Sequence, residues 1–169
     1  MLISFLIWLQ NLQPFSDLRS SAYVYPVVLA LHLSAISLFG AMIVATDLRL
    51  LGWALRDGSL ADVIVRLRWP KRIGFLFAAT CGFLLFSSKA EEYYYNPYFR
   101  AKISLLVLVA VHALVFRKSV YRDAELDLTP EPPPRAKLAA GLSLLLWLSI
   151  LCAGRYIGYV EGRSGMHFK

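Results

Sequence analysis

Residues 22–46 read AYVYPVVLALHLSAISLFGAMIVAT and contain no charged side chain. An α-helix of about 20 apolar residues crosses the hydrocarbon core of a bilayer, so this stretch predicts a tilted membrane-spanning helix. His32 lies inside it. An ionisable side chain within a span is by default a candidate functional residue, because burying it in lipid costs free energy. His32 is therefore the first candidate site residue.

Three further apolar stretches bring the number of candidate spans to four, and they cover residues 73–88, 99–116 and 138–159. In the second of these, the uncharged core runs only from Ile103 to Phe116, so the flanking Lys102 is expected to snorkel to the membrane surface. Four spans with short connections predict an all-α fold, an integral membrane four-helix bundle that forms a single domain over residues 1–169.

The first residues of the chain, MLISFLIWLQNLQPF, lack the basic start and the small-residue cleavage site of a signal peptide. The uncharged stretch that ends near Pro14 and Asp17 is marginal for a membrane crossing. We expect residues 2–13 to form an amphipathic helix that lies in the outer interface, with Trp8 in lipid. A fifth span is the alternative.

The composition is that of a protein dissolved in a bilayer. Hydrophobic residues make up 58% of the chain and charged residues 17%, and the mean hydropathy is +0.56. A soluble domain has about 45–50% apolar and about 25% charged residues. The net charge of +7 does not indicate nucleic-acid binding, because lysines and arginines gather in short segments between the spans. The expected partner is the lipid bilayer, with no nucleic acid.

The same basic residues predict the orientation of the chain. Most of them lie in the two connections at residues 47–72 and 117–137, and basic connections stay in the cytoplasm. Both termini are therefore expected on the periplasmic side of a bacterial inner membrane. Apolar spacing in the first connection predicts a short helix over residues 59–69 that Pro70 ends. The proline-rich segment 123–134 is expected to be extended.

A second histidine, His112, lies in the span at 99–116. In the expected orientation, His32 lies roughly 14 Å and His112 roughly 18 Å below the outer surface. Two imidazoles at similar depth on separate helices are what a b-type haem needs. Gly40, on the same face as His32, would leave space for the porphyrin, and Arg155 would supply a cation for a propionate. These four residues are the predicted cofactor-binding residues.

Other interpretations of these residues stay open. A lone transmembrane histidine often only hydrogen-bonds a neighbouring helix. Cys81 and Cys152 lie in the outer half of their spans, and with His32 and His112 they would make a soft-ligand site for copper. The simpler interpretation of the two cysteines is that they are buried, inert thiols.

Asp47 and Arg49 close the first span within the sequence TDLRLLG. A local ion pair or a helix cap is their simplest interpretation, and a proton or quinone route is the other. The chain contains no Gly-rich phosphate loop, no nucleophile–base pair and no paired catalytic carboxylates. A hydrolase or a nucleotide-dependent enzyme is therefore not expected, and other enzymatic activity stays open.

Three segments resemble a family of uncharacterised bacterial four-helix membrane proteins: ALHLSAISLFGAMIVATDLRLLG (30–52), YYNPYFRAK (94–102) and LWLSILCAGRYIGYVEG (146–162). The positions that match the family pattern are His32, Asp47, Arg49, Asn96, Pro97, Lys102 and Arg155. At the position of His112 the family has Asn as often as His. The resemblance implies the fold and the topology, and the loose similarity of the family to copper-export and cytochrome b561-like bundles is analogy only.

These observations lead to one functional expectation and its alternatives. We expect an electron-transfer protein in which His32 and His112 hold a b-type haem between the quinone pool and an outer-side partner protein. The alternative is a non-enzymatic accessory or assembly subunit, or a permease for a small solute or for copper. In that case the polar residues of the spans would mainly connect helices.

Overall fold

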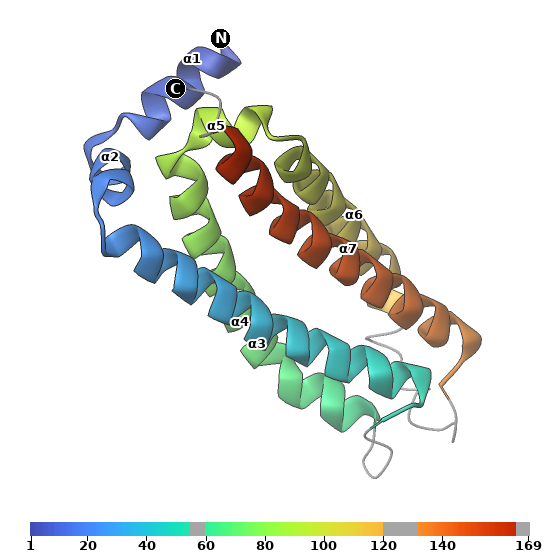
Figure 1. The fold of residues 1–169 in the computed structure, drawn as a ribbon. Coiled ribbons are helices and arrows are strands. Elements are labelled where there is room, and N and C mark those ends of the chain that lie inside the picture. Colours follow the sequence, from blue (N-terminus) through green and yellow to red (C-terminus); the bar gives the residue numbers. More distant parts are fainter. Residues whose placement is uncertain (55–59, 120–131, 165–169) are drawn as a thin grey trace.

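The structure, a computed structural model, describes residues 1–54, 60–119 and 132–164. These residues form seven helices, which are α1 (Leu2–Gln10), α2 (Gln13–Ser20), α3 (Val24–Leu51), α4 (Leu60–Ser88), α5 (Ala90–Tyr95), α6 (Pro97–Ser119) and α7 (Pro134–Ser164) (Figure 1). No strand occurs among them, which confirms the all-α expectation. The expectation for segment 123–134 falls almost entirely outside the described residues.

Four of these helices are long and apolar enough to cross a membrane, and they are α3, α4, α6 and α7. Large apolar side chains face outward along their length. Leu38 is 69% exposed, Leu76 67% and Leu114 69%. A monomeric soluble protein does not expose apolar surface over whole helices, because water would penalise it. The chain is therefore a multi-pass membrane protein whose outward surface contacts lipid.

Local sequence explains where two of the long helices begin and end. The carboxyl end of α3 is Gly52, with φ of 76°, and its backbone N–H donates to the Arg49 carbonyl at 3.0 Å. Glycine fits there because the left-handed backbone suits a residue without a Cβ atom. At the start of α6, the Asn96 side chain accepts hydrogen bonds from the backbone N–H groups of Tyr98 and Phe99, at 3.0 and 3.2 Å.

The expected helix end at Pro70 is wrong, because α4 continues through that residue. A proline inside a helix costs about 3 kcal/mol through the lost hydrogen bond and the ring clash. Contacts on both sides of Pro70 oppose this cost. Ile64 is buried in the core, and Lys71 donates a hydrogen bond of 3.1 Å to the Thr46 hydroxyl on α3. Packing against α3 thus keeps the two parts of α4 in one helix.

The N-terminal segment forms two short helices where one was expected. Helix α1 has nine residues, which rise only about 14 Å, so it is too short to be a fifth span. Its apolar side chains Leu2, Phe5 and Trp8 are more than half exposed. Helix α1 packs against α5 and the end of α4. A membrane surface is the environment that such an exposed apolar helix fits.

The four long helices form a bundle in which α3 and α7 are central. Helix α3 packs along α4 and α7, and α7 packs along α6. We call the end of the bundle that carries α1, α2 and α5 the α5 end (Figure 1). The opposite end, named the Leu50 end, holds the main apolar core, formed by Leu50, Leu60, Ile64, Ala136, Ala139 and Ala140.

Candidate functional site

His32 is fixed by the backbone of the neighbouring helix. Its Nδ1 lies 2.9 Å from the carbonyl oxygen of Ala78 on α4. A carbonyl can only accept, so Nδ1 carries the hydrogen and donates it. In the neutral ring the lone pair is then on Nε2. His32 thus offers an acceptor, or a metal ligand, in a fixed orientation.

A glycine makes room for this imidazole. A Cβ atom added at Gly82 would lie 2.9 Å from Cε1 and 3.6 Å from Nε2 of His32. Carbon atoms do not approach that closely without repulsion, so any larger residue at this position would displace the ring. The α4 backbone at Ala78 and Gly82 therefore forms the wall on which His32 rests.

Lys102 on α6 points into the bundle toward this wall and toward α7. Its Nζ lies 3.6 Å from the position that a Cβ of Gly154 would occupy, and its ammonium is close enough to His32 for an electrostatic interaction. This arrangement differs from the snorkelling to the membrane surface that we expected. Among the described side chains no carboxylate interacts with Lys102. We call His32, Gly82, Lys102 and Gly154 the Lys102 site.

Stacked aromatic rings lie next to the Lys102 site, on its α5 side. Phe86 stacks on Phe99 with ring centroids 5.3 Å apart and planes 4° from parallel, and Tyr93 stacks on Phe99 at 5.1 Å. Phe86 lies about one turn from Gly82 on α4, and Phe99 about one turn from Lys102 on α6. The Lys102 site is therefore covered by flat apolar surfaces toward the α5 end.

On the other side of the site, three aromatic side chains close the bundle. Phe39 on α3 lies 5.8 Å from Phe75 on α4 and 5.2 Å from Trp147 on α7, measured between ring centroids. Gly74 lets α3 approach, since its Cβ would lie 3.4 Å from Cβ of Phe39. We call Phe39, Phe75 and Trp147 the aromatic layer. It separates the Lys102 site from the Leu50 end.

A second polar group lies beyond the aromatic layer, and we call it the Asp47 cluster: Thr46, Asp47, Lys71 and Ser143. Thr46 and Asp47 on α3 are each only 1% exposed. Lys71 on α4 donates to the Thr46 hydroxyl at 3.1 Å and interacts electrostatically with Asp47, and Ser143 on α7 hydrogen-bonds the Asp47 carboxylate. The Asp47 cluster thus ties three helices together near the Leu50 end.

One oxygen of this cluster has no partner. Asp47 Oδ2 is buried and makes no hydrogen bond with any of the described residues. The sequence offered Arg49 as a local ion-pair partner for Asp47, whereas Lys71 on another helix provides a charge of opposite sign. The hydrogen bond from Ser143 and the nearby charge of Lys71 therefore offset part of the cost of burying this carboxylate.

His112 occupies a different layer from His32. Its Nε2 donates a hydrogen bond of 3.0 Å to the carbonyl of Ala139, a residue of the Leu50-end core, and its ring lies 4.9 Å from that of Phe116. Along α6, His112 is about ten residues beyond Lys102, which corresponds to roughly 15 Å. The structure therefore does not bring His32 and His112 together, and each hydrogen-bonds the backbone of a neighbouring helix.

The other two predicted haem-site residues have separate surroundings. Nothing lies within 4 Å of the position that a Cβ of Gly40 would occupy. Arg155 is exposed, and its guanidinium donates to the Tyr159 hydroxyl at 3.4 Å and lies 5.0 Å from the centre of that ring. The cation close to His32 is Lys102.

The two cysteines are free thiols in different environments, Cys81 buried and Cys152 exposed. Within residues 1–54, 60–119 and 132–164, no three side chains of His, Cys, Asp or Glu gather closely enough to hold a metal ion. The expected copper ligands, Cys81 and Cys152 with the two histidines, are therefore not assembled into one group.

Sequence reasoning did not select Lys102 and Lys71 as site residues. A lysine at the edge of an apolar stretch has the same sequence pattern whether it points outward or into the bundle. One sequence observation did point to Lys102, namely its match to the family pattern in YYNPYFRAK. No comparable sequence pattern pointed to Lys71, whose partners lie on α3.

The fold and these buried polar groups define a small helical multi-pass membrane protein. Residues 20–160 match the family of unknown function DUF6644, and because this range covers most of the chain, the protein belongs to that family. No curated protein and no solved structure matches the chain. The loose similarity to copper-export and cytochrome b561-like bundles is not supported by these comparisons.

Proposed function

We propose that this protein is a permease of the bacterial cytoplasmic membrane that carries a small organic anion, with the Lys102 site as its binding site. The observation that carries the proposal is the ammonium of Lys102, which points into the bundle with no carboxylate partner among the described residues. An ionisable group held inside a membrane bundle marks a solute pathway more often than a packing feature. An anionic ligand would supply the missing charge.

The neighbouring groups suit such a ligand. Lys102 donates hydrogen bonds with a positive charge, and Nε2 of His32 accepts one. A hydroxy acid presents both complements, a carboxylate for Lys102 and a hydroxyl for His32. Gly82 and Gly154 make room for the His32 ring and the Lys102 side chain, and the rings of Phe86 and Phe99 supply an apolar boundary.

The distribution of basic residues supports an orientation with the α5 end outside. The segments 47–72 and 117–137, which include the facing ends of α3 and α4 and of α6 and α7, hold most of the lysines and arginines, and such basic segments stay in the cytoplasm. Both termini are then periplasmic. In this orientation the Lys102 site belongs to the outer half of the bundle, and the Asp47 cluster belongs to the inner half.

In the proposed orientation, contacts between helices close the cytoplasmic side of the Lys102 site. The aromatic layer and the Asp47 cluster connect α3 to α4 and α7 on the inner side of the Lys102 site. Transport would require these contacts to separate while others form on the outer side, as in alternating access. The Asp47 cluster is then the inner gate of the proposed permease.

The test is uptake into liposomes that contain the purified protein. The probes are radiolabelled lactate, pyruvate and succinate, driven by an inside-positive potential. We expect uptake of at least one probe above protein-free liposomes, and Lys102→Met to lower its initial rate about tenfold, the effect of one lost charge-assisted hydrogen bond. Arg100→Met is the matched control, because Arg100 lies two positions away on α6 and is exposed.

The proposal fails if none of the three probes enters faster than in protein-free liposomes. It also fails if Lys102→Met and Arg100→Met reduce uptake equally, since the effect would then follow net charge and not the Lys102 site. Lactate should be preferred over pyruvate, because only lactate offers a hydroxyl donor to Nε2 of His32.

A second candidate function is electron transfer by a b-type haem, between the quinone pool and an outer-side partner protein. The observation that favours it is the hydrogen bond from Nδ1 of His32 to Ala78, which leaves Nε2 as a ligand in the manner of many metal-bound histidines. Lys102 would pair with a propionate. His112 uses Nε2 for the Ala139 carbonyl, so the geometry favours His32 over His112 as a ligand.

A reduced-minus-oxidised visible spectrum of the protein, expressed with haem supplied, separates the two functions. The haem proposal predicts a b-type band that His32→Ala abolishes and His112→Ala retains. A protein without the band, or a band that survives His32→Ala, contradicts it. Elemental analysis of the same sample tests for copper.

A further inference from the structure

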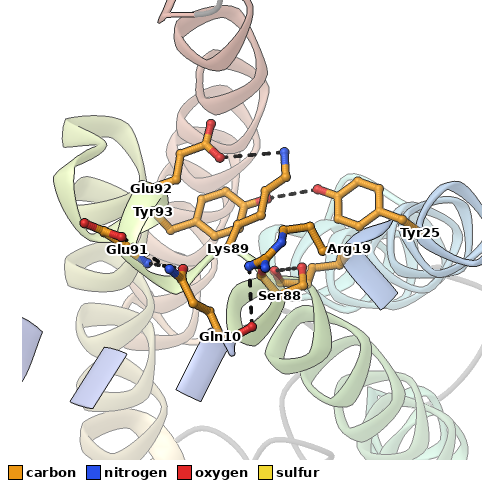
Figure 2. A network of polar contacts seen from close by, with 9 residues as sticks. Gln10, Arg19, Tyr25, Ser88, Lys89, Glu91, Glu92 and Tyr93 are labelled. Carbon is orange, nitrogen blue, oxygen red and sulfur yellow. Dashed lines mark hydrogen bonds and ion pairs between the residues drawn. The ribbon is translucent and has the colours of Figure 1, made fainter. Parts of the chain in front are cut away.

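The surface of the α5 end has a hollow of about 300 Å³, away from the Lys102 site. Helices α1, α2 and α5 and the end of α4 meet there (Figure 2). The residues that line it are Gln10, Arg19, Lys89, Glu91, Glu92 and Tyr95. Four of these six side chains are charged, two of them basic and two acidic. We call this hollow the headgroup pocket.

The basic part of the headgroup pocket comes from α2 and the end of α4. Arg19 donates through Nη1 to the carbonyls of Ser88, at 3.0 Å, and Gln10, at 3.4 Å. These two bonds fix the guanidinium beside the hollow, where Figure 2 shows it between α1 and α4. Lys89 lies at the carboxyl end of α4 and pairs with Glu92 at 3.7 Å, with both side chains partly exposed.

The acidic part comes from α5. Gln10 holds Glu91 in a reciprocal pair, in which its Nε2 donates to Oε2 of Glu91 at 3.2 Å and its Oε1 accepts from the Glu91 backbone N–H at 3.1 Å. This leaves the second carboxylate oxygen of Glu91 for a ligand. Glu92 adds another carboxylate on the same short helix.

The position of the pocket indicates a lipid as the source of the ligand. Helix α1, which borders it, exposes Leu2, Phe5 and Trp8, the apolar and aromatic residues of a helix that lies in the membrane surface. Tyr95 lines the hollow itself, and tyrosines gather at the depth of lipid headgroups. Both features are those of a pocket at the level of lipid headgroups.

We infer that the headgroup pocket binds phosphatidylethanolamine, with the lipid phosphate on Arg19 and Lys89 and the ammonium on Glu91 and Glu92. A primary ammonium donates hydrogen bonds to carboxylates, as the trimethylated group of phosphatidylcholine does not. Phosphatidylglycerol has no cation and would meet two carboxylates. This inference does not depend on the proposed permease function. A bound lipid here would fasten α1 and α2 to α5.

The test measures lipid retention by the delipidated full-length protein in mild detergent. An equimolar mixture of phosphatidylethanolamine, phosphatidylcholine and phosphatidylglycerol is added, and bound lipid is counted by native mass spectrometry. We expect phosphatidylethanolamine to be retained about tenfold over each of the others. Glu91→Gln should remove this preference while its amide oxygen still accepts from Gln10, so the fold is kept. Arg19→Gln should weaken retention of all three lipids.

Asp17→Asn is the matched control, because Asp17 is an exposed carboxylate on α2 outside the pocket, and it should leave the preference unchanged. Equal retention of the three lipids overturns the inference, as does a preference that survives Glu91→Gln. Soluble phosphoethanolamine is added in a separate experiment. If it displaces the lipid at equimolar concentration, the pocket binds a free compound and the assignment to a lipid is overturned.

Discussion

Two half-buried lysines on different helices of the bundle, Lys71 and Lys102, have opposite surroundings. Lys71 in the Asp47 cluster donates to the Thr46 hydroxyl at 3.1 Å and has the Asp47 carboxylate as a countercharge. Lys102 lies near the imidazole of His32, and no carboxylate among the described side chains interacts with it. The same residue type therefore holds helices together at one site and leaves a charge to be matched at the other.

The two sites also differ in packing, and the Asp47 cluster is the more tightly packed of the two. Thr46 and Asp47 are almost completely buried, whereas the Lys102 site is bordered by the glycines Gly82 and Gly154. Glycine at a helix contact costs helix stability, and the compensation is close approach of another group. A compensated charge in a tight contact suits a gate, and an uncompensated charge whose side chain has space beside a glycine suits a binding site.

The largest loss of stability is expected from a substitution in the Asp47 cluster. Asp47→Ala should lower the free energy of unfolding by roughly 3 kcal/mol, because Lys71 keeps a buried charge without its partner. Unfolding in sodium dodecyl sulfate followed by circular dichroism measures it. Asp47→Ala combined with Lys71→Met should recover most of the loss, since both charges are then gone. A double variant as unstable as the single one would show that Asp47 acts through something other than Lys71.

A smaller effect is expected at the wall of the Lys102 site. Gly82→Ala places a Cβ 2.9 Å from Cε1 of His32, and overpacking of this kind costs about 2 kcal/mol. Gly40→Ala is the control on α3, because nothing lies within 4 Å of its added Cβ. It should be neutral or slightly stabilising. Equal stability of the two variants in the same unfolding assay would contradict the contact between Gly82 and His32.

The uncompensated lysine should respond in the opposite direction. Lys102→Met removes a charge that has no partner in the described chain, so the protein should be equally stable or more stable by about 1 kcal/mol. The same variant should lose uptake, which separates stability from function. A loss of stability as large as that of Asp47→Ala would show that Lys102 is a structural residue, as Lys71 is.

The smallest effect is expected at His112. His112→Asn, the residue that the family resemblance associates with this position, shortens the reach to the Ala139 carbonyl at 3.0 Å. Interhelical hydrogen bonds in membranes average about 0.6 kcal/mol, so the stability should fall by about that amount. Uptake should be unchanged, because His112 hydrogen-bonds Ala139 at the Leu50 end and lies about 15 Å along α6 from Lys102. Reduced uptake would place His112 on the solute pathway.

Much of the fold could be predicted from residues taken in short windows. Helix α3 begins two residues into the stretch at 22–46 and covers the rest of it, and the apolar stretch at 138–159 lies within α7, because hydropathy summed over about 20 residues decides whether a segment stays in lipid. Pro70 is the exception among the local features. The local sequence predicts a helix end there, and contacts with α3 keep the helix continuous.

The candidate site was only partly predictable. His32 is recognisable because it interrupts an apolar span, but its hydrogen bond to Ala78 and the space at Gly82 join segments far apart in the sequence. His112 and Arg155 share the same kind of sequence context, and the structure gives them partners of their own. The depth of a residue follows from its position in a helix, whereas the direction of its side chain around that helix does not.

Apolar windows and basic connections were sufficient to predict a multi-pass helical membrane protein and which residues lie within its spans. Packing between α3, α4, α6 and α7 decided which of the buried charges meet a partner. The physical reason is that transfer into lipid adds up residue by residue along the chain, whereas the compensation of a charge requires a second group within a few ångströms. Whether Lys71 or Lys102 has a countercharge depends on how the helices are rotated and which helices they contact, and no single segment of the sequence encodes this.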